Sequence, residues 1–124
     1  DKGYRVAAVV HPTACVSCTA NIGEGVVLLA GTIVNARASI GRGVILNTSA
    51  TVDHDCVIGD GVHISPGVHL AGNVHIGKES WIGIGASIRE GVRIGENAIV
   101  GAGAAVVSDV RDGATVGGVP AREL

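Results

Sequence analysis

The chain has 124 residues, 47% of them hydrophobic, a formal net charge of −2 and an isoelectric point near 6.2. This balance, with Lys and Arg scattered along the chain, argues against nucleic acid or an anionic membrane surface as the main partner, and no apolar run is long enough to span a membrane. With one Trp, one Tyr and no Phe or Met, the single domain expected at this length must have an aliphatic core.

Residues 1–9 precede any regular pattern, and we expect them to be a lead-in that joins the chain to something upstream. His11 and Pro12 then mark the start of the regular part. A proline is tolerated there because the first strand lies at an edge and its backbone N–H is not needed by a neighbour.

Residues 10–108 carry a strict six-residue repeat, in which every sixth residue is aliphatic and the residue two positions earlier is small or slim. Neither an α-helix nor an ordinary sheet has a period of six. A hexapeptide repeat is typical of a parallel β-helix, in which short strands wind into stacked coils. The aliphatic positions, called rungs below, are Val10, Val16, Ile22, Leu28, Val34, Ile40, Leu46, Val52, Ile58, Ile64, Leu70, Ile76, Ile82, Ile88, Ile94, Val100 and Val106.

A second period, of eighteen residues, indicates which hexads lie above one another. A glycine follows the rung at every third hexad, for example at Gly41, Gly59 and Gly77. Three hexads therefore form one triangular coil, and the repeat makes about six coils. At these glycines we expect a corner where the backbone needs a positive φ or a close approach.

Residues 109–124 lose the repeat and are rich in Gly, with a Pro near the end. This composition predicts a short irregular tail that leaves the triangular prism formed by the stacked coils. The expected fold class is therefore all-β: a parallel β-helix of about six triangular coils over residues 10–108, followed by this tail.

The residue directly before each rung should point outward. On one face of the triangle, the residues at this position form an apolar stripe that contains the only Trp. Such a stripe indicates that the face packs against another copy of the chain. The closed symmetry that best suits a three-sided prism is a trimer. Stray exposed aliphatic side chains are the alternative. The stripe consists of Val27, Ile45, His63, Trp81 and Ile99.

The three cysteines cannot all pair, which is consistent with a reducing compartment, and we expect a cytoplasmic protein. Cys56 occupies an inward small-residue position, so we interpret it as part of the core. Cys15 and Cys18 form a lone C-x-x-C near His11. A zinc site needs four ligands and a redox motif needs a βαβ context, so we interpret this spacing as coincidence.

Polar side chains suited to chemistry are concentrated in residues 47–72, which include the only His-Asp pair, His54-Asp55. Ala36 should lie one coil below His54 and Gly72 one coil above it. We therefore expect the imidazole to stand in a notch with space along the prism axis. The alternative is a solvated pair at a corner.

His63, His69 and His75 are spaced by six residues, so each should face a different side of the triangle. They cannot converge within one subunit. This argues against a three-histidine metal site, and we expect no metal.

The hexad ladder, the segment NTSATVDHDCVIGDGVHISPGVHLAG at residues 47–72 and the closing GGVPAREL resemble the C-terminal domain of bacterial sugar acetyltransferases of the hexapeptide class. The resemblance points to enzymes that N-acetylate nucleotide-linked 4-amino sugars, of the bacillosamine and perosamine pathways, and to the related sialic acid O-acetyltransferases. It covers nearly the whole chain from Val10 onward. Its most specific part is the string D-H-[DE]-C-x-I-G-x-x-x-H-I-x-P-G.

This resemblance implies a left-handed winding, acetyl-CoA as co-substrate and a sugar acceptor. It also implies that His54 is the catalytic base and that Asp55 raises its basicity. Family members usually begin with a Rossmann-like subdomain that holds the nucleotide-sugar, so we expect residues 1–9 to join a missing subdomain of this kind; the alternative is a chain that recognises its acceptor differently. The positions that the resemblance assigns to cofactor binding are His63, beside the thioester, and the main chain of Gly72, Ile84 and Ala102.

Asn47 matches a family position beside the sugar site, although an asparagine here is also suited to begin an asparagine ladder or to cap a turn. The chemistry fits the residues present. An amine must lose a proton as it attacks the thioester carbonyl, and a histidine is suited to accept that proton at neutral pH. A backbone N–H near Gly72 is our candidate donor to the oxyanion, and no cysteine has the setting of a nucleophile.

Three alternatives stay open at this point. The acceptor is a hydroxyl group if the chain follows the sialic acid O-acetyltransferases. A γ-class carbonic anhydrase shares the prism but needs a further pair of suitably spaced histidines. A non-catalytic β-helix would bind no acetyl-CoA.

Overall fold

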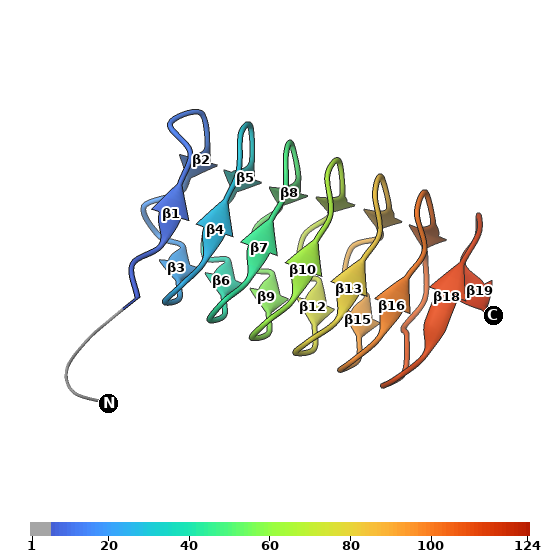
Figure 1. Ribbon diagram of the computed structural model, residues 1–124. Helices are drawn as coiled ribbons and strands as arrows, with labels where there is room; N and C mark the ends of the chain where they lie inside the picture. The colour runs from blue at the N-terminus through green and yellow to red at the C-terminus, as the bar shows by residue number, and fades with distance from the viewer. Residues whose placement is uncertain (1–5) are drawn as a thin grey trace.

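The computed structural model describes residues 6–124, which form a β-helix of short strands and tight turns (Figure 1). No α-helical segment occurs among these residues. Residues 1–5 of the expected lead-in lie outside the described residues. The strands of the repeat have two residues each and recur every six residues. They are β1 (Val9–Val10), β2 (Cys15–Val16), β3 (Asn21–Ile22), β4 (Val27–Leu28), β5 (Ile33–Val34), β6 (Ser39–Ile40), β7 (Ile45–Leu46), β8 (Thr51–Val52), β9 (Val57–Ile58), β10 (His63–Ile64), β11 (His69–Leu70), β12 (His75–Ile76), β13 (Trp81–Ile82), β14 (Ser87–Ile88), β15 (Arg93–Ile94), β16 (Ile99–Val100) and β17 (Ala105–Val106), followed by β18 (Thr115–Gly117) and β19 (Arg122–Glu123).

Each strand of the repeat ends on a predicted rung, so the six-residue prediction is confirmed. From Leu28 to Val106 every rung is at most 2% exposed. The first coil is more open, because no coil covers its outer side: Val10 is 48% exposed, and Val16 and Ile22 are half-buried.

The strands form three parallel sheets, one on each side of the prism. Sheet A contains β1, β4, β7, β10, β13, β16 and β18, with β19 added antiparallel at its end, sheet B runs from β2 to β17, and sheet C runs from β3 to β15. Within the repeat every strand pairs with the strand three places further on, as in the register His63↔Trp81. Three hexads therefore make one coil, as the eighteen-residue period predicts, and the coils stack along one axis (Figure 1).

From Val26 to Ala104 the residue two positions before each rung also points inward and is buried, whereas Ala14 and Ala20 in the open first coil are only half-buried. Two of these positions are polar, and both hydroxyl groups are satisfied. The Thr32 hydroxyl donates to the Leu29 carbonyl at 2.9 Å, and the Ser80 hydroxyl donates to the Gly95 carbonyl at 2.7 Å. Cys56 is fully buried, as predicted, and burial raises the pKa of its thiol.

The glycines that follow every third rung are explained by a close approach of backbones and not by a positive φ. A Cβ on Gly41 would lie 2.8 Å from the backbone N of Asp60 in the next coil. The positive φ occurs two residues later, at the third position after a rung, as at Gly43 with φ 66° and Gly61 with φ 69°. The close approach is therefore the reason for these glycines, and the expected positive φ is wrong.

Residues other than glycine also occupy the third position after a rung with a positive φ. Along the corner between sheets B and C, this holds for Arg37, Asp55 and Asn73, with φ of 58°, 59° and 58°. Asn and Asp tolerate this conformation better than most residues. These three stacked residues form a ridge, and the candidate site includes two of them.

The predicted tail is more regular than its composition suggests, because the prism continues into its first half. Val110 bridges to Ile94, and β18 pairs in parallel with β16 in the register Val100↔Val116. Both pairs are 16 residues apart instead of 18, so a fixed step of six residues misses them. Strand β19 then turns back antiparallel to β18. Among residues 6–124 there is no helix of the length and apolarity needed to cross a membrane.

Candidate active site

His54 lies at the corner between sheets B and C, in the turn from β8 to β9. Its side chain is 45% exposed, so the ring is reachable from solvent. The Nδ1 atom lies 3.0 Å from Oδ2 of Asp55. An ionised carboxylate can only accept hydrogen bonds, so Nδ1 carries the hydrogen and the lone pair is left on Nε2. The pair that the sequence singles out is therefore assembled.

Asp55 has a second partner, Arg37, which the sequence analysis did not include. The guanidinium Nε donates to Oδ1 of Asp55 at 2.9 Å, and Nη2 donates to Oδ2 at 3.0 Å. The hydrogen bonds from Arg37, and then that from His54, lower the pKa of Asp55 from 3.8 to about 2. The carboxylate therefore stays ionised throughout the physiological pH range.

A second carboxylate holds the backbone of this corner. Oδ1 of Asp53 accepts the backbone N–H of His54 at 2.7 Å and the side-chain amide of Asn35 at 3.2 Å. The turn that carries the imidazole is thus fixed on the main-chain side by Asp53 and on the side-chain side by Asp55.

Gly72 lies one coil above His54, as predicted, but the imidazole itself occupies the space that the missing side chain leaves. A Cβ on Gly72 would lie 2.5 Å from Nε2 and 2.6 Å from Cε1 of His54. The expected notch is therefore filled by the ring. The N–H of Gly72 makes no hydrogen bond to any residue between 6 and 124, and Nε2 lies beside this glycine.

His63 belongs to a different surface, the outer face of sheet A. Its ring stacks on Trp81 with the ring centroids 4.0 Å apart and the planes at 15°. Partial burial lowers the pKa of His63, which favours the neutral imidazole. Trp81 is 51% exposed. The apolar stripe is aligned as predicted, because Val27, Ile45, His63, Trp81 and Ile99 pair in register along this sheet.

The other predicted positions lie at the corner between sheets A and B. The Asn47 side chain accepts the backbone N–H of Thr48 at 2.8 Å, which is a local turn contact. Ile84 is 61% exposed, and Ala102 is exposed one coil above it. Residues eighteen apart share a corner, so these two positions form one edge parallel to the axis.

The predicted residues therefore form two groups within one chain. His54, Asp55 and Gly72 occupy the corner between sheets B and C, whereas His63 lies on sheet A. In a triangular prism that corner is opposite sheet A. The two histidines cannot meet within a single copy.

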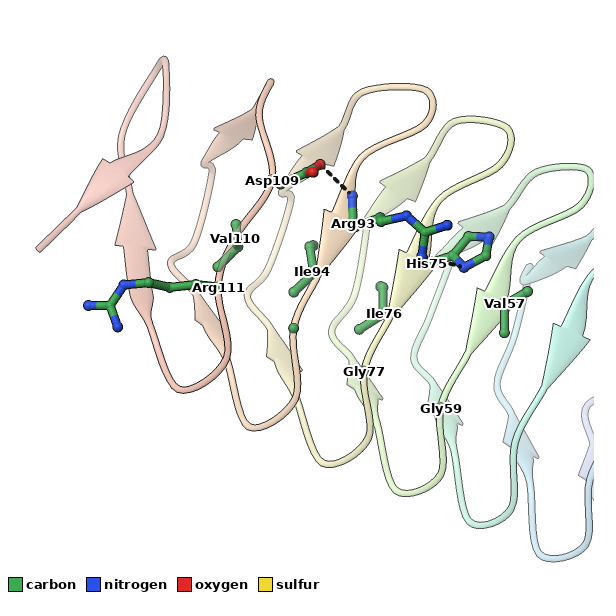
Figure 2. A pocket seen from close by; sticks show the side chains of 11 residues that line it. Val57, Gly59, His75, Ile76, Gly77, Arg93, Ile94, Asp109, Val110 and Arg111 are labelled. Atoms are coloured by element: carbon green, nitrogen blue, oxygen red, sulfur yellow. Dashed lines mark hydrogen bonds between the residues drawn. The ribbon is translucent and has the colours of Figure 1, made fainter.

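An open depression of about 560 Å³ lies elsewhere, on the outer face of sheet C (Figure 2). Arg93 extends over it with Nη1 3.4 Å from Nδ1 of His75, and Asp109 accepts the backbone N–H of Arg93 at 2.9 Å. None of the predicted site residues lines this depression.

The three histidines spaced by six lie on three different sheets, as predicted: His63 on sheet A, His69 on sheet B and His75 on sheet C. Over residues 6–124 no group of three or more His, Cys, Asp or Glu side chains is placed to hold a metal ion.

The pairing of Arg37 with Asp55 and the ring stack within the predicted stripe were not predicted as contacts, although the eighteen-residue period contains both. Arg37 precedes Asp55 by eighteen residues, and His63 precedes Trp81 by the same interval.

Comparison with known proteins agrees with this architecture. The family model described as bacterial transferase hexapeptide (six repeats) matches residues 37–72 and 73–107. No curated protein matches the sequence.

Several solved structures are similar along almost the whole chain. The acetyltransferase domain of PglB from Neisseria gonorrhoeae is 49% identical over 98% of this chain and 60% of that one, with a TM-score of 0.97, and has also been solved with acetyl coenzyme A. PerB from Caulobacter crescentus, solved with CoA and GDP-perosamine, is 43% identical over 98% of this chain and 59% of that one, with a TM-score of 0.96. WeeI from Acinetobacter baumannii is 40% identical over 95% of this chain and 58% of that one, with a TM-score of 0.92. The chain thus spans about 60% of the length of these relatives.

Proposed function

The chain belongs to the bacterial hexapeptide transferases, and from that premise we propose that it transfers an acetyl group from acetyl-CoA to the amino group of a nucleotide-linked amino sugar. The observation that carries the proposal is the hydrogen bond of 3.0 Å between Nδ1 of His54 and Asp55. It leaves Nε2 with a free lone pair on a half-exposed ring. The relatives support the substrates, since one was solved with acetyl coenzyme A and another with CoA and GDP-perosamine.

In the proposed reaction the sugar amine attacks the thioester carbonyl carbon, and a C–N bond forms. His54 Nε2 takes the proton that the amine loses. Asp55 stabilises the resulting imidazolium, and the N–H of Gly72 is our candidate donor to the oxyanion. The tetrahedral intermediate then expels the CoA thiolate, which takes a proton from the imidazolium. The products are the acetamido sugar and CoA.

We propose that the site lies between two copies of the chain in a homotrimer. His54 and His63 lie on opposite sides of the prism, so a site that uses both needs His54 from one copy and His63 from another. The apolar stripe around Trp81 supports a contact between copies. The neutral His63 ring would then lie near the thioester, and its stack on Trp81 would fix its orientation.

For the remaining residues we propose the roles that the family resemblance implies. Ile84 and Ala102 form an exposed edge parallel to the axis, which suits a groove for the extended pantetheine arm of acetyl-CoA. We propose Asn47 as a residue beside the sugar, although its side chain also caps its own turn.

We further propose that residues 10–108 are the acetyltransferase unit of a protein that has a separate nucleotide-sugar-binding subdomain joined through residues 1–9. A cytoplasmic location is proposed with it, because Cys15, Cys18 and Cys56 are free thiols and thiols persist in reducing compartments.

The test is release of free CoA thiol from acetyl-CoA in the presence of a panel of acceptors: 4-amino-sugar nucleotides, their non-amino counterparts and sialic acid. We expect thiol release with an amino sugar, and we expect the His54→Ala variant to lose it while its melting temperature stays near that of the wild type. Thiol release at the original rate in His54→Ala would show that His54 is not the base. Thiol release with sialic acid alone would show that the acceptor group is a hydroxyl and not an amine.

A further inference from the structure

We propose that Arg37 is a positioning residue for the His54–Asp55 pair: its guanidinium holds the Asp55 carboxylate in the orientation that keeps the hydrogen on His54 Nδ1. This inference rests on the proposed function, in which Nε2 is the atom that accepts the proton. It adds a third member to the pair, supplied by the preceding coil.

The geometry of the carboxylate carries the argument. Arg37 binds both oxygens, with Nε at 2.9 Å from Oδ1 and Nη2 at 3.0 Å from Oδ2. Oδ2 also accepts the Nδ1 hydrogen of His54 at 3.0 Å. A bidentate guanidinium pair fixes the plane of a carboxylate as well as its position. Rotation of the Asp55 side chain would break both bonds to Arg37, so the acceptor stays aimed at Nδ1.

The backbone brings the two side chains into this arrangement. Arg37 and Asp55 are one coil apart on the same corner, and both have the positive φ of the ridge, 58° and 59°. The N–H of Asp55 donates to the Ala36 carbonyl at 3.0 Å. The N–H of Arg37 donates to the Thr19 hydroxyl oxygen at 3.0 Å. Arg37 therefore reaches Asp55 along the axis from an anchored corner.

A role in stability explains this contact less well. The side chains of Arg37 and Asp55 are 63% and 34% exposed, and ion pairs at such exposure contribute little to folding. Within residues 6–124 no other basic side chain besides His54 contacts Asp55. The neighbouring carboxylate of Asp53 accepts from Asn35 and the backbone of His54, and Arg37 does not contact it.

The test is the Arg37→Met variant, which keeps a long side chain and removes every donor. The first measurement is the nitrogen NMR spectrum of the His54 imidazole in the full chain, at a pH where the ring is neutral. We expect the wild type to carry its hydrogen on Nδ1 and the variant to show both tautomers. The second measurement is the steady-state rate: kcat should fall by about ten- to a hundredfold, as expected for a misaligned catalytic group, while KM for acetyl-CoA changes by less than about twofold.

A control is Arg111→Gln, which removes another exposed Arg–carboxylate pair, held by a single hydrogen bond from Nε of Arg111 to Oε1 of Glu123 at 2.8 Å. It should leave both the tautomer and kcat unchanged. The Arg37→Gly variant suits the positive φ and leaves space for free guanidinium ion, which should restore part of the lost rate at millimolar concentration.

A His54 spectrum in Arg37→Met identical to that of the wild type would overturn the inference, and so would an equal loss of kcat in Arg111→Gln. The tautomer measurement also separates the two proposals. If the wild type transfers acetyl to no acceptor, the proposed function fails, but a mixed tautomer in Arg37→Met alone would still establish the orientation of Asp55 by Arg37.

Discussion

Replacing Gly72 by alanine should slow the proposed acetyl transfer without destabilising the fold. The new Cβ would lie 2.5 Å from Nε2 and 2.6 Å from Cε1 of His54, whereas carbon atoms in van der Waals contact are about 3.5–4.0 Å apart. The imidazole must therefore move by about 1 Å or rotate away. A displacement of that size in a catalytic group costs about a hundredfold in rate, so we expect kcat to fall by that factor.

The backbone conformation at position 72 is open to any residue, so the only strain from a new Cβ is its contact with the half-exposed His54 ring, which can move toward solvent. The equivalent position after other rungs is occupied by residues with a Cβ, such as Ala36 and Ile84, and Gly72 does not have a positive φ. A Gly-to-Ala change at such a position stabilises a protein by about 0.4–1 kcal/mol through the unfolded chain. The melting temperature should therefore stay constant or rise while the rate falls.

The assay is thiol release from acetyl-CoA together with thermal unfolding, and the control is Gly117→Ala. Its new Cβ would lie 3.4 Å from Cδ1 of Leu124, a flexible side chain far from His54 along the chain, so the rate should stay at the wild-type value. A Gly72→Ala enzyme with full kcat would refute the reasoning, because it would mean that the ring can leave its observed position without loss of function.

Two further predictions concern the assembly and the acidic pH range. Trp81→Glu puts a carboxylate on the apolar stripe, where burial against another copy would be costly, so light scattering should detect smaller particles than for the wild type; an unchanged mass would remove the stripe as an interface. The pKa of Asp55 is lowered from 3.8 to about 2, so its pairing adds a stabilisation above pH 3.8, kept small by solvent exposure, which is lost as the pH falls through about 2. The melting temperature of Asp55→Asn, a change that the positive φ tolerates, should thus lie below that of the wild type near neutral pH. The difference should shrink below pH 3.8 and vanish only below about pH 2; a difference that does not depend on pH would contradict the pairing.

The sequence was sufficient to predict the core because the core is periodic. Every rung from Leu28 to Val106 is buried, and the pairing of strands follows from the eighteen-residue period. The backbone conformation at the corners was predicted less accurately, because the residue type at equivalent corner positions changes from coil to coil. The residues with a positive φ include Arg37 and Asp55 as well as glycines, so glycine content alone could not locate them. The last turn was missed because its pairs, such as Val100↔Val116, are 16 residues apart.

The candidate site was predicted only in part, because only some of its contacts follow from the sequence or from its period. The His54–Asp55 contact joins neighbours in sequence and is readable from it. The position of Gly72 was also predictable, but the sequence could not indicate that the His54 ring would fill the space left by the missing side chain of Gly72. The contacts of Arg37 and Trp81 depend on side-chain rotamers as well as register, and rotamers leave no periodic signal.

The stacking of equivalent corners also limits how the gene can change in length. Six inserted residues between Arg37 and Asp55 would preserve the alternation of inward and outward side chains, so the interior would still pack. They would also turn everything downstream by one side of the triangle, and the guanidinium would then face a different corner. Folding in this architecture tolerates duplications of one hexad, whereas the constellation around His54 survives only changes that leave residues 37–72 in phase. A hexad inserted within residues 37–72 should therefore leave the prism folded and take the site around His54 apart.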